Sequence, residues 1–292
     1  MTYLQSGKTG LTFRLALAVS LLLLPFAHAQ QTPNWTEQEK PIEAQIIGLR
    51  GLPDDVRAQT TKDLALQIRA LPPTPGKLQL AYKLANRATE GDFGHDTLQE
   101  VATTLADALQ QQPTQDTSNF APYNELAQLV RYEHVQTTLN APQLELAMAA
   151  LESADKRRQE ANFTLTDLHG KTWTLKDLRG EVVLVNFWAT WCPPCQKEMP
   201  DLEALYKEFR HQHFVILAIS DEDADKVKPF LSERKITYPV MLDPDRKVFN
   251  AFQVEGIPKS FVYDRDGKLV AQSIDMRTQR QFREMLAQAG LK

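Results

Sequence analysis

The sequence predicts an all-α segment followed by an α/β domain with a mixed sheet. Between residues 36 and 160 apolar residues recur at helical spacing, and prolines and glycines separate the helices. From about residue 162 short strands alternate with helices. Repeated β-α-β units build a sheet with helices on both faces. We therefore expect three parts: a leader over 1–29, a helical domain over 30–158 and an α/β domain over 159–292.

The composition is that of an ordinary globular protein. The chain has 292 residues, of which 42% are hydrophobic and 24% charged, and its formal net charge is -4. This length is sufficient for two domains. The charge balance and the lack of a basic stripe give no reason to expect nucleic acid as a partner.

The N-terminus has the order of a secretory signal. Lys8 and Arg14 precede an apolar run over 15–27, and Ala-His-Ala follows at 27–29. The run is shorter than the roughly 20 residues that a membrane span needs. We expect cleavage after Ala29 and an exported, periplasmic or extracytoplasmic protein. The alternative is an uncleaved signal that anchors the chain in the membrane.

The helical segment offers no recognisable chemistry. It contains no cysteine and no convincing repeat, and His95 and His134 are isolated. Its helices are expected in six stretches: 36–52, 53–72, 75–91, 95–113, 122–139 and 142–160. A docking, dimerisation or scaffold role fits this composition equally well.

The C-terminal part predicts a fixed order of elements. A hairpin over 162–175 precedes a strand over 181–189 whose apolar run indicates burial on both faces. Helices and strands then alternate up to a second hairpin over 259–273 and a closing helix over 278–290. The predicted order is β-hairpin, β, α, β, α, β, α, β, β, α.

The stretch NFWATWCPPCQKEMP, residues 186–200, holds both cysteines of the chain, Cys192 and Cys195. Such a pair can clip a loop, bind a metal or exchange electrons. A loop this short gives little cross-link stabilisation, because that effect grows with loop length. Electron exchange is favoured by a preceding buried strand and a following helix.

Two other chemistries are open to a cysteine pair. Two thiolates can bind copper(I) or zinc, but a third ligand is expected. The candidate ligands His169, His211 and His213 are not expected beside the pair, so no metal site is predicted, although a metal chaperone or metal-site reductant stays an alternative. A Thr-x-x-Cys peroxidase site is missing, since Ala189 stands three residues before Cys192.

Three segments carry a resemblance to a known family: 182–200 around the cysteines, 216–243, and VEGIPKSFVYDRDGKLV at 254–270. Over about residues 160–292 the chain resembles the exported TlpA/ResA-type disulfide reductases of the thioredoxin fold. The resemblance implies a thioredoxin-like domain with an N-terminal β-hairpin and reduction of protein disulfides. It also implies a membrane thiol transporter as electron donor, and no cofactor is expected.

The cysteines are expected to have different roles. Cys192 would stand just before a helix whose first positions are Pro193 and Pro194, and the helix N-terminus would lower its pKa. Cys192 is therefore the predicted attacking thiol. Cys195, one turn on, is expected to be more buried and to resolve the mixed disulfide.

The resemblance adds further site residues. A glutamate stands in ResA-like members where Glu198 stands here, and it is tied to control of the thiols; the alternative is a solvated helix charge. Asn186 occupies the strand position of a buried acid in thioredoxin and cannot titrate. Pro258 is expected to follow a cis bond, with Ile257 touching substrate. Trp191, Pro193 and Pro194 are expected to form a docking surface.

The predicted function is thus an exported protein-disulfide reductase. Maturation of cytochrome c, reduction of a copper-site protein and general disulfide repair remain open as pathways. A helical interaction module that carries a redox domain as its tool is a further alternative. Reduction is preferred to oxidation because the resemblance is to reducing members.

Overall fold

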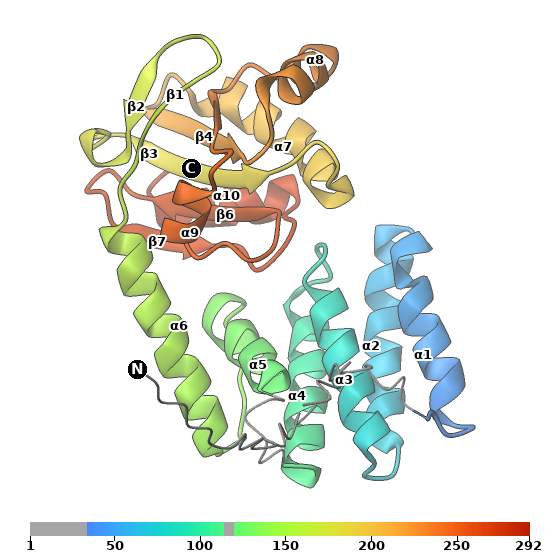
Figure 1. The fold of residues 1–292 in the computed structure, drawn as a ribbon. Coiled ribbons are helices and arrows are strands. Elements are labelled where there is room, and N and C mark those ends of the chain that lie inside the picture. Colours follow the sequence, from blue (N-terminus) through green and yellow to red (C-terminus); the bar gives the residue numbers. More distant parts are fainter. Residues whose placement is uncertain (1–33, 114–119) are drawn as a thin grey trace, which may run out of the picture. The chain divides into compact units, whose positions relative to one another are not determined.

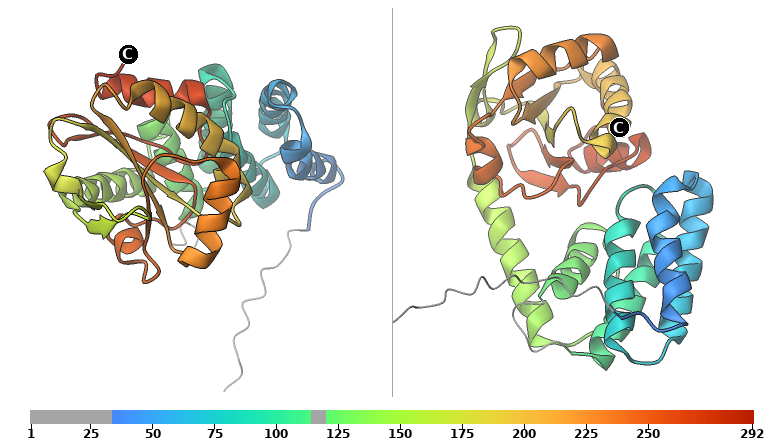
Figure 2. Two further views of the ribbon diagram at one scale, coloured as in Figure 1. Left: turned by 90° about the horizontal axis from the view of Figure 1, so that it is seen from above. Right: turned by 45° about the vertical axis from the view of Figure 1, so that its right-hand side comes forward.

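The structure, a computed structural model, describes residues 34–113 and 120–292. The predicted leader over 1–29 lies outside the described residues. Residues Asn34–Lys292 belong to one compact unit, drawn in Figures 1 and 2.

The first part of this unit is helical, as predicted. Its elements are α1 Glu39–Gly48, the short 3-10 helix η1 Leu49–Gly51, α2 Asp54–Ala70, α3 Pro75–Ala88, α4 His95–Gln111, α5 Ala121–Tyr132 and α6 Pro142–Glu160. α4 packs against both α2 and α3, and α5 packs against α6. Leu64, Leu84 and Leu105 are fully buried between these helices. The predicted boundary at 158/159 falls within the last turn of α6, and the division into domains stays a prediction.

The helix predicted over 122–139 is wrong at its C-terminal end. α5 ends at Tyr132, and His134 has a positive φ of 57°. The following backbone is held from outside the helix, because Gln99 Nε2 donates to the carbonyl of Gln136 and Gln99 Oε1 accepts from its N–H. These tertiary contacts replace the helical hydrogen bonds that the local apolar pattern favours.

The second part has the predicted order of strands and helices. The elements are β1 Thr164–Thr166, β2 Thr172–Thr174, the 3-10 helix η3 Leu175–Asp177, β3 Val182–Trp188, α7 Pro193–Phe209, β4 Phe214–Ser220, α8 Ala224–Arg234, β5 Val240–Leu242, α9 Lys247–Ala251, β6 Lys259–Tyr263, β7 Leu269–Gln272 and α10 Gln279–Gln288. The main sheet has the order β5-β4-β3-β6-β7. β3 is parallel to β4 and antiparallel to β6, so the sheet is mixed as expected. The hairpin β1–β2 forms a separate two-stranded sheet.

Two apolar cores lie on the two faces of the main sheet. Because side chains alternate along a strand, Leu184 and Trp188 of β3 belong to one core, and Val185 and Phe187 belong to the other. Apolar residues of α7, α8 and α10 complete the first core, and those of α9 and of the segments around the hairpin complete the second. Asn186 therefore projects into the core that contains α7. A polar side chain at this position needs polar partners.

Candidate active site

The topology brings the two cysteines and the segment before β6 to the same edge of the sheet. β3 ends at Trp188, and after a loop of four residues α7 begins at Pro193. β6 runs antiparallel to β3, with Lys259 opposite Phe187. The start of β6 therefore lies beside the end of β3. Cys192 Sγ accordingly lies 3.7 Å from the carbonyl oxygen of Ile257.

Cys192 and Cys195 form a disulfide at the start of α7. Cys192 is the N-cap residue, and the N–H of Cys195 points at Cys192 Sγ over 3.3 Å. Pro193 and Pro194 occupy the first two helical positions and have no N–H. The N–H of Cys195 is thus the first amide donor of the helix, and it is directed at the sulfur that is expected to become the thiolate.

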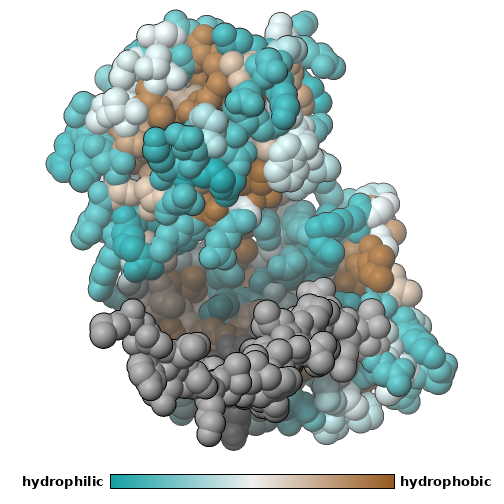
Figure 3. All heavy atoms as spheres, in the orientation of Figure 1, coloured by the Kyte–Doolittle hydropathy of each residue, from teal (hydrophilic) through white to brown (hydrophobic). Residues whose placement is uncertain are grey.

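The two cysteines differ little in exposure. Cys192 is 3% exposed and Cys195 is 1% exposed. Cys195 is thus only slightly more buried than Cys192 in this disulfide form. By contrast, the preceding Trp191 is 65% exposed. On the face drawn in Figure 3, the coloured surface is mainly hydrophilic, with apolar residues in separate groups. An exposed indole next to the disulfide is a suitable apolar contact for a partner protein.

The predicted substrate-binding residues differ in their exposure. Pro193 and Pro194 are exposed, Ile257 is half-buried and Pro258 is buried. The Ile257–Pro258 peptide bond is cis, as expected. Trp191, Pro193 and Pro194 adjoin Cys192 in the chain, and the carbonyl of Ile257 lies beside its sulfur. Their contact with substrate stays a prediction.

Glu198 is buried, and its reading as a solvated helix charge is wrong. The residue is 2% exposed, and both carboxylate oxygens have partners. Asn186 Nδ2 donates to Oε1 over 2.9 Å, and the backbone N–H of Arg277 donates to Oε2 over 3.2 Å. Asn186 also donates to Ser260 Oγ on the neighbouring strand. Glu198 follows Cys195 by three residues and therefore shares its side of the helix.

Burial raises the pKa of Glu198 to about 8. The N–H of Arg277, the amide of Asn186 and the positive charge of Arg277 oppose this shift, while Asp201 adds to it. A carboxyl group with this pKa can both release and accept a proton near neutral pH. Glu198 therefore has the chemistry that Asn186 lacks.

The sequence interpretation missed two residues that fix the site. Glu222 accepts hydrogen bonds from the N–H and Oγ1 of Thr190, in the loop that carries Cys192. The signal was available, since Glu222 comes just after β4 and parallel strands end at one edge of a sheet. Arg277 gave no such signal, because it lies 79 positions from Glu198 and acts through its backbone.

The candidate histidine ligands do not surround the disulfide. His211 and His213 follow the C-terminal end of α7, whereas Cys192 caps its N-terminal end, and a helix of 17 residues is about 25 Å long. His169 lies in the turn between β1 and β2. Within residues 34–113 and 120–292, no group of three or more His, Cys, Asp or Glu side chains is placed to hold a metal ion.

A dithiol–disulfide pair at the start of a helix, beside a cis-proline loop in a thioredoxin-like fold, defines a thiol-disulfide oxidoreductase. Residues 157–272 match the AhpC/TSA family. The chain is 39% identical over 135 residues to thiol-disulfide oxidoreductase ResA of Bacillus thuringiensis (strain Al Hakam), a match that covers 44% of this chain and 78% of the relative. It therefore belongs to the ResA family of thiol-disulfide oxidoreductases.

Two further proteins illustrate this likeness. The ResA protein of Bacillus subtilis (strain 168) is 39% identical over 123 residues, which cover 42% of this chain and 69% of that protein. A solved thiol:disulfide interchange protein from Chlorobium tepidum TLS is 32% identical, covers 44% of this chain and 92% of its own, and has a TM-score of 0.41. Among the residues that the structure describes, no helix has the length and apolarity to cross a membrane.

Proposed function

We propose that this chain is an exported reductase of protein disulfides in which Cys192 attacks and Cys195 resolves. The observation that carries the proposal is the N–H of Cys195 directed at Cys192 Sγ at the start of α7. A thiolate at that position gains a hydrogen bond and the favourable end of the helix dipole. Its neighbour Cys195 is already within bonding distance.

The proposed reaction consists of two successive thiol–disulfide exchanges. The Cys192 thiolate attacks one sulfur of the substrate disulfide, a mixed disulfide forms, and the first substrate sulfur leaves as a thiolate that takes up a proton. Cys195 then loses its proton and attacks Cys192 Sγ, which releases the second substrate sulfur. The substrate gains two electrons and two protons, and the enzyme ends with the Cys192–Cys195 disulfide. The ionised form of Glu198 is the proposed acceptor for the Cys195 proton.

The two prolines support reduction rather than oxidation. A strong oxidant of this chemistry has a strongly stabilised reduced form. Here Pro193 and Pro194 remove two of the amide donors that a helix N-terminus otherwise offers to a thiolate. With Cys195 as the first donor, the helix start stabilises the Cys192 thiolate less than a helix with all its N-terminal amide donors would. The disulfide form is therefore favoured relative to the reduced form. This arrangement supports the proposed low reduction potential.

The setting and the partners are part of the same proposal. The leader pattern over 1–29 supports export, and a reductase in an oxidising compartment needs a supply of electrons. By the family resemblance, a membrane thiol transporter supplies them. Trp191 and the cis-proline loop would receive the substrate protein, and apocytochrome c, a copper-site protein or a misoxidised protein are the candidate substrates. The helical segment would dock a partner.

The test is made on purified residues 30–292. A reduction potential near −270 mV, as in thioredoxin, is expected, whereas a value near −120 mV, as in strong oxidants, overturns the assignment as a reductase. Cys195→Ser is expected to accumulate a mixed disulfide with its substrate, and Cys192→Ser is expected to reduce no insulin. Full insulin reduction by Cys192→Ser would overturn the mechanism.

A further inference from the structure

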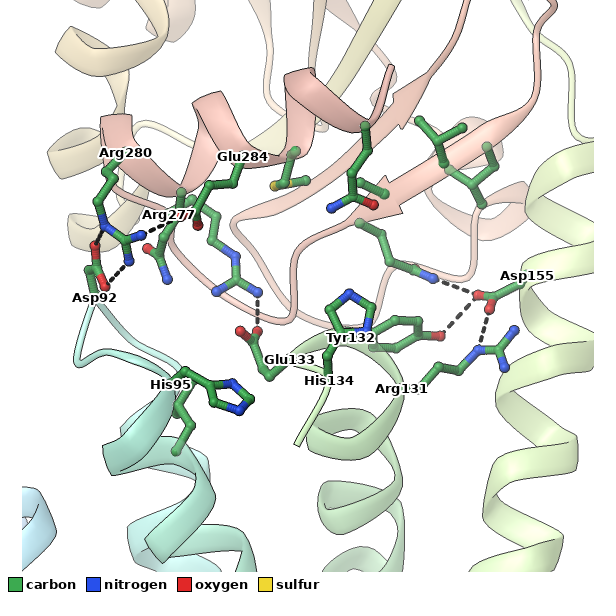
Figure 4. A pocket seen from close by; sticks show the side chains of 18 of the residues that line it. Asp92, His95, Arg131, Tyr132, Glu133, His134, Asp155, Arg277, Arg280 and Glu284 are labelled. Atoms are coloured by element: carbon green, nitrogen blue, oxygen red, sulfur yellow. Dashed lines mark hydrogen bonds and ion pairs between the residues drawn. The ribbon is translucent and has the colours of Figure 1, made fainter. Parts of the chain in front are cut away.

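The segment 273–278, which connects β7 to α10, joins the proposed proton acceptor to the helical part of the chain. At Arg277 the backbone N–H donates to Glu198 Oε2 over 3.2 Å. The guanidinium of the same residue forms an ion pair with Glu133, which directly follows α5. Figure 4 shows Arg277 and Glu133 pointing toward one another from α10's side and α5's side of a cavity. Arg277 thus contacts both structures.

Burial makes this ion pair effective. The side chains of Arg277 and Glu133 are 5% and 10% exposed. Charges in such a setting are screened less than surface charges. An arginine keeps its charge in proteins, so Arg277 stays positive even when its partner is removed. The net field that this pair exerts on Glu198 therefore depends on whether Glu133 balances Arg277.

We propose that Arg277 is a positioning residue for Glu198, and that Glu133 of the helical part governs the charge of Glu198 through Arg277. The backbone of Arg277 holds one carboxylate oxygen, and its side chain supplies a positive charge that Glu133 partly cancels. The helical segment would in this way adjust the proton chemistry of the cysteine pair. This inference rests on the proposed function, in which Glu198 serves Cys195.

Glu198 is surrounded by few other charged or titratable groups. Asp201 on α7 raises its pKa, and Arg277 lowers it. Tyr238, which is buried just before β5, is affected by the charge of Glu198. The facing side chains on β3 and β6 are the neutral Asn186 and Ser260. Among these groups, Arg277 is the one that an ion pair connects to the helical segment.

The experiment titrates Glu198 directly in the oxidised protein, residues 30–292, by ¹³C NMR of the glutamate carboxyl groups. Glu198→Gln assigns the signal. Arg277→Met removes the positive charge and is expected to raise the midpoint by about one pH unit. Glu133→Gln keeps a hydrogen-bond acceptor, removes the opposing negative charge and is expected to lower the midpoint. The double variant is expected to fall between the two single variants.

A neighbouring ion pair provides the matched control. Arg280 on α10 pairs with Asp92, which precedes α4, at 2.5 Å, and it has no contact with Glu198 among the described interactions. Asp92→Asn therefore removes a second ion pair between the same two parts of the chain. Its Glu198 midpoint is expected to equal that of the wild type.

Arg277→Met and Glu133→Gln are expected to shift the Glu198 midpoint in opposite directions. A general loosening of the structure would not produce opposite shifts from the two partners of one ion pair. Equal midpoints in all variants, or shifts of the same sign in Arg277→Met and Glu133→Gln, would overturn the proposal. The rate of Cys192 alkylation against pH is a separate readout in the reduced protein. If the Glu198 midpoints shift as expected and the alkylation profiles do not, the link to Glu133 stands and the proposed role of Glu198 in thiol chemistry fails.

Discussion

At the level of single residues, the environment of a side chain decides what it can do. Glu198 and Glu37 have the same carboxyl group, but Glu37 is exposed on the surface, whereas Glu198 is enclosed by Asn186 and the backbone of Arg277. Burial raises the pKa of Glu198 to about 8. The carboxyl group is therefore neutral in most molecules at pH 7 and ionises just above it.

This ionisation predicts a specific pH dependence of stability. In the unfolded chain Glu198 loses its proton near 4.5, whereas in the folded chain it keeps the proton up to about 8. Between these values the folded state binds the extra proton, so the unfolding free energy falls as the pH rises from about 4.5 to about 8. The loss from this group is on the order of a few kcal/mol.

Glu198→Gln removes this dependence. At pH 5 the variant is expected to be less stable by about 1 kcal/mol, because an amide cannot accept both hydrogen bonds. At pH 9 it is expected to be more stable than the wild type. Urea unfolding with the disulfide intact, from pH 5 to pH 9, measures the difference. The exposed Glu233→Gln is the control, and parallel profiles for Glu198→Gln and the wild type would contradict the assignment.

At the level of elements, the site depends on where strands end and where a helix begins. The loop between β3 and α7 carries Trp191 and Cys192, and Glu222 at the end of β4 holds it through Thr190. Gln196 Nε2 also donates to the carbonyl of Thr190, and Arg234 of α8 holds the Gln196 side chain. Three consecutive elements therefore fix a short loop.

Glu222→Ala is expected to loosen this loop. The N–H of Thr190 would lose a charged acceptor, so the unfolding free energy is expected to fall by about 2 kcal/mol. The rate of insulin reduction is expected to fall several-fold, since Cys192 would no longer be held at the helix start. Urea unfolding and the insulin assay measure both effects. Glu233→Ala, an exposed residue of α8, is the control, and wild-type values in Glu222→Ala would refute the role of Glu222.

At the level of the whole molecule, buried polar contacts connect the helical segment to the thioredoxin-like part. Arg158, in the last turn of α6, donates to the carbonyl of Phe252 and to Gln272, and pairs with Asp155. Tyr263 donates to the carbonyl of Arg158. With the Arg277–Glu133 pair, these contacts join the two parts within the compact unit Asn34–Lys292.

Arg158→Ala is expected to weaken this connection. The Arg158 side chain is 9% exposed. Its removal takes one hydrogen-bond donor from the carbonyl of Phe252 and one from the carboxylate of Asp155. The unfolding free energy is expected to fall by about 3 kcal/mol. The neighbouring Arg157, which is exposed and binds Ser153 and Gln253, is the control as Arg157→Ala. Equal urea midpoints for the two variants would show that Arg158 does not hold the parts together.

The amino-acid sequence was sufficient for everything that local chemistry controls. Apolar periodicity predicted the order of strands and helices in residues 162–290. The Cys192-x-x-Cys195 pair, with a buried strand before it and a helix after it, indicated a redox pair. The prolines at 193 and 194 predicted the helix start. These features depend on residues a few positions apart in the chain, so they can be predicted from local sequence patterns.

The fold decided what depends on distant partners. The end of α5 was predicted seven residues too late, because Gln99 and not the local pattern holds the backbone after it. The burial of Glu198 and its contact with Arg277 were equally hidden, since a helix charge looks the same in sequence whether it faces water or a core. Desolvation and pairing arise only when strands, helices and the 273–278 segment pack together, and they give this carboxyl group its proposed function.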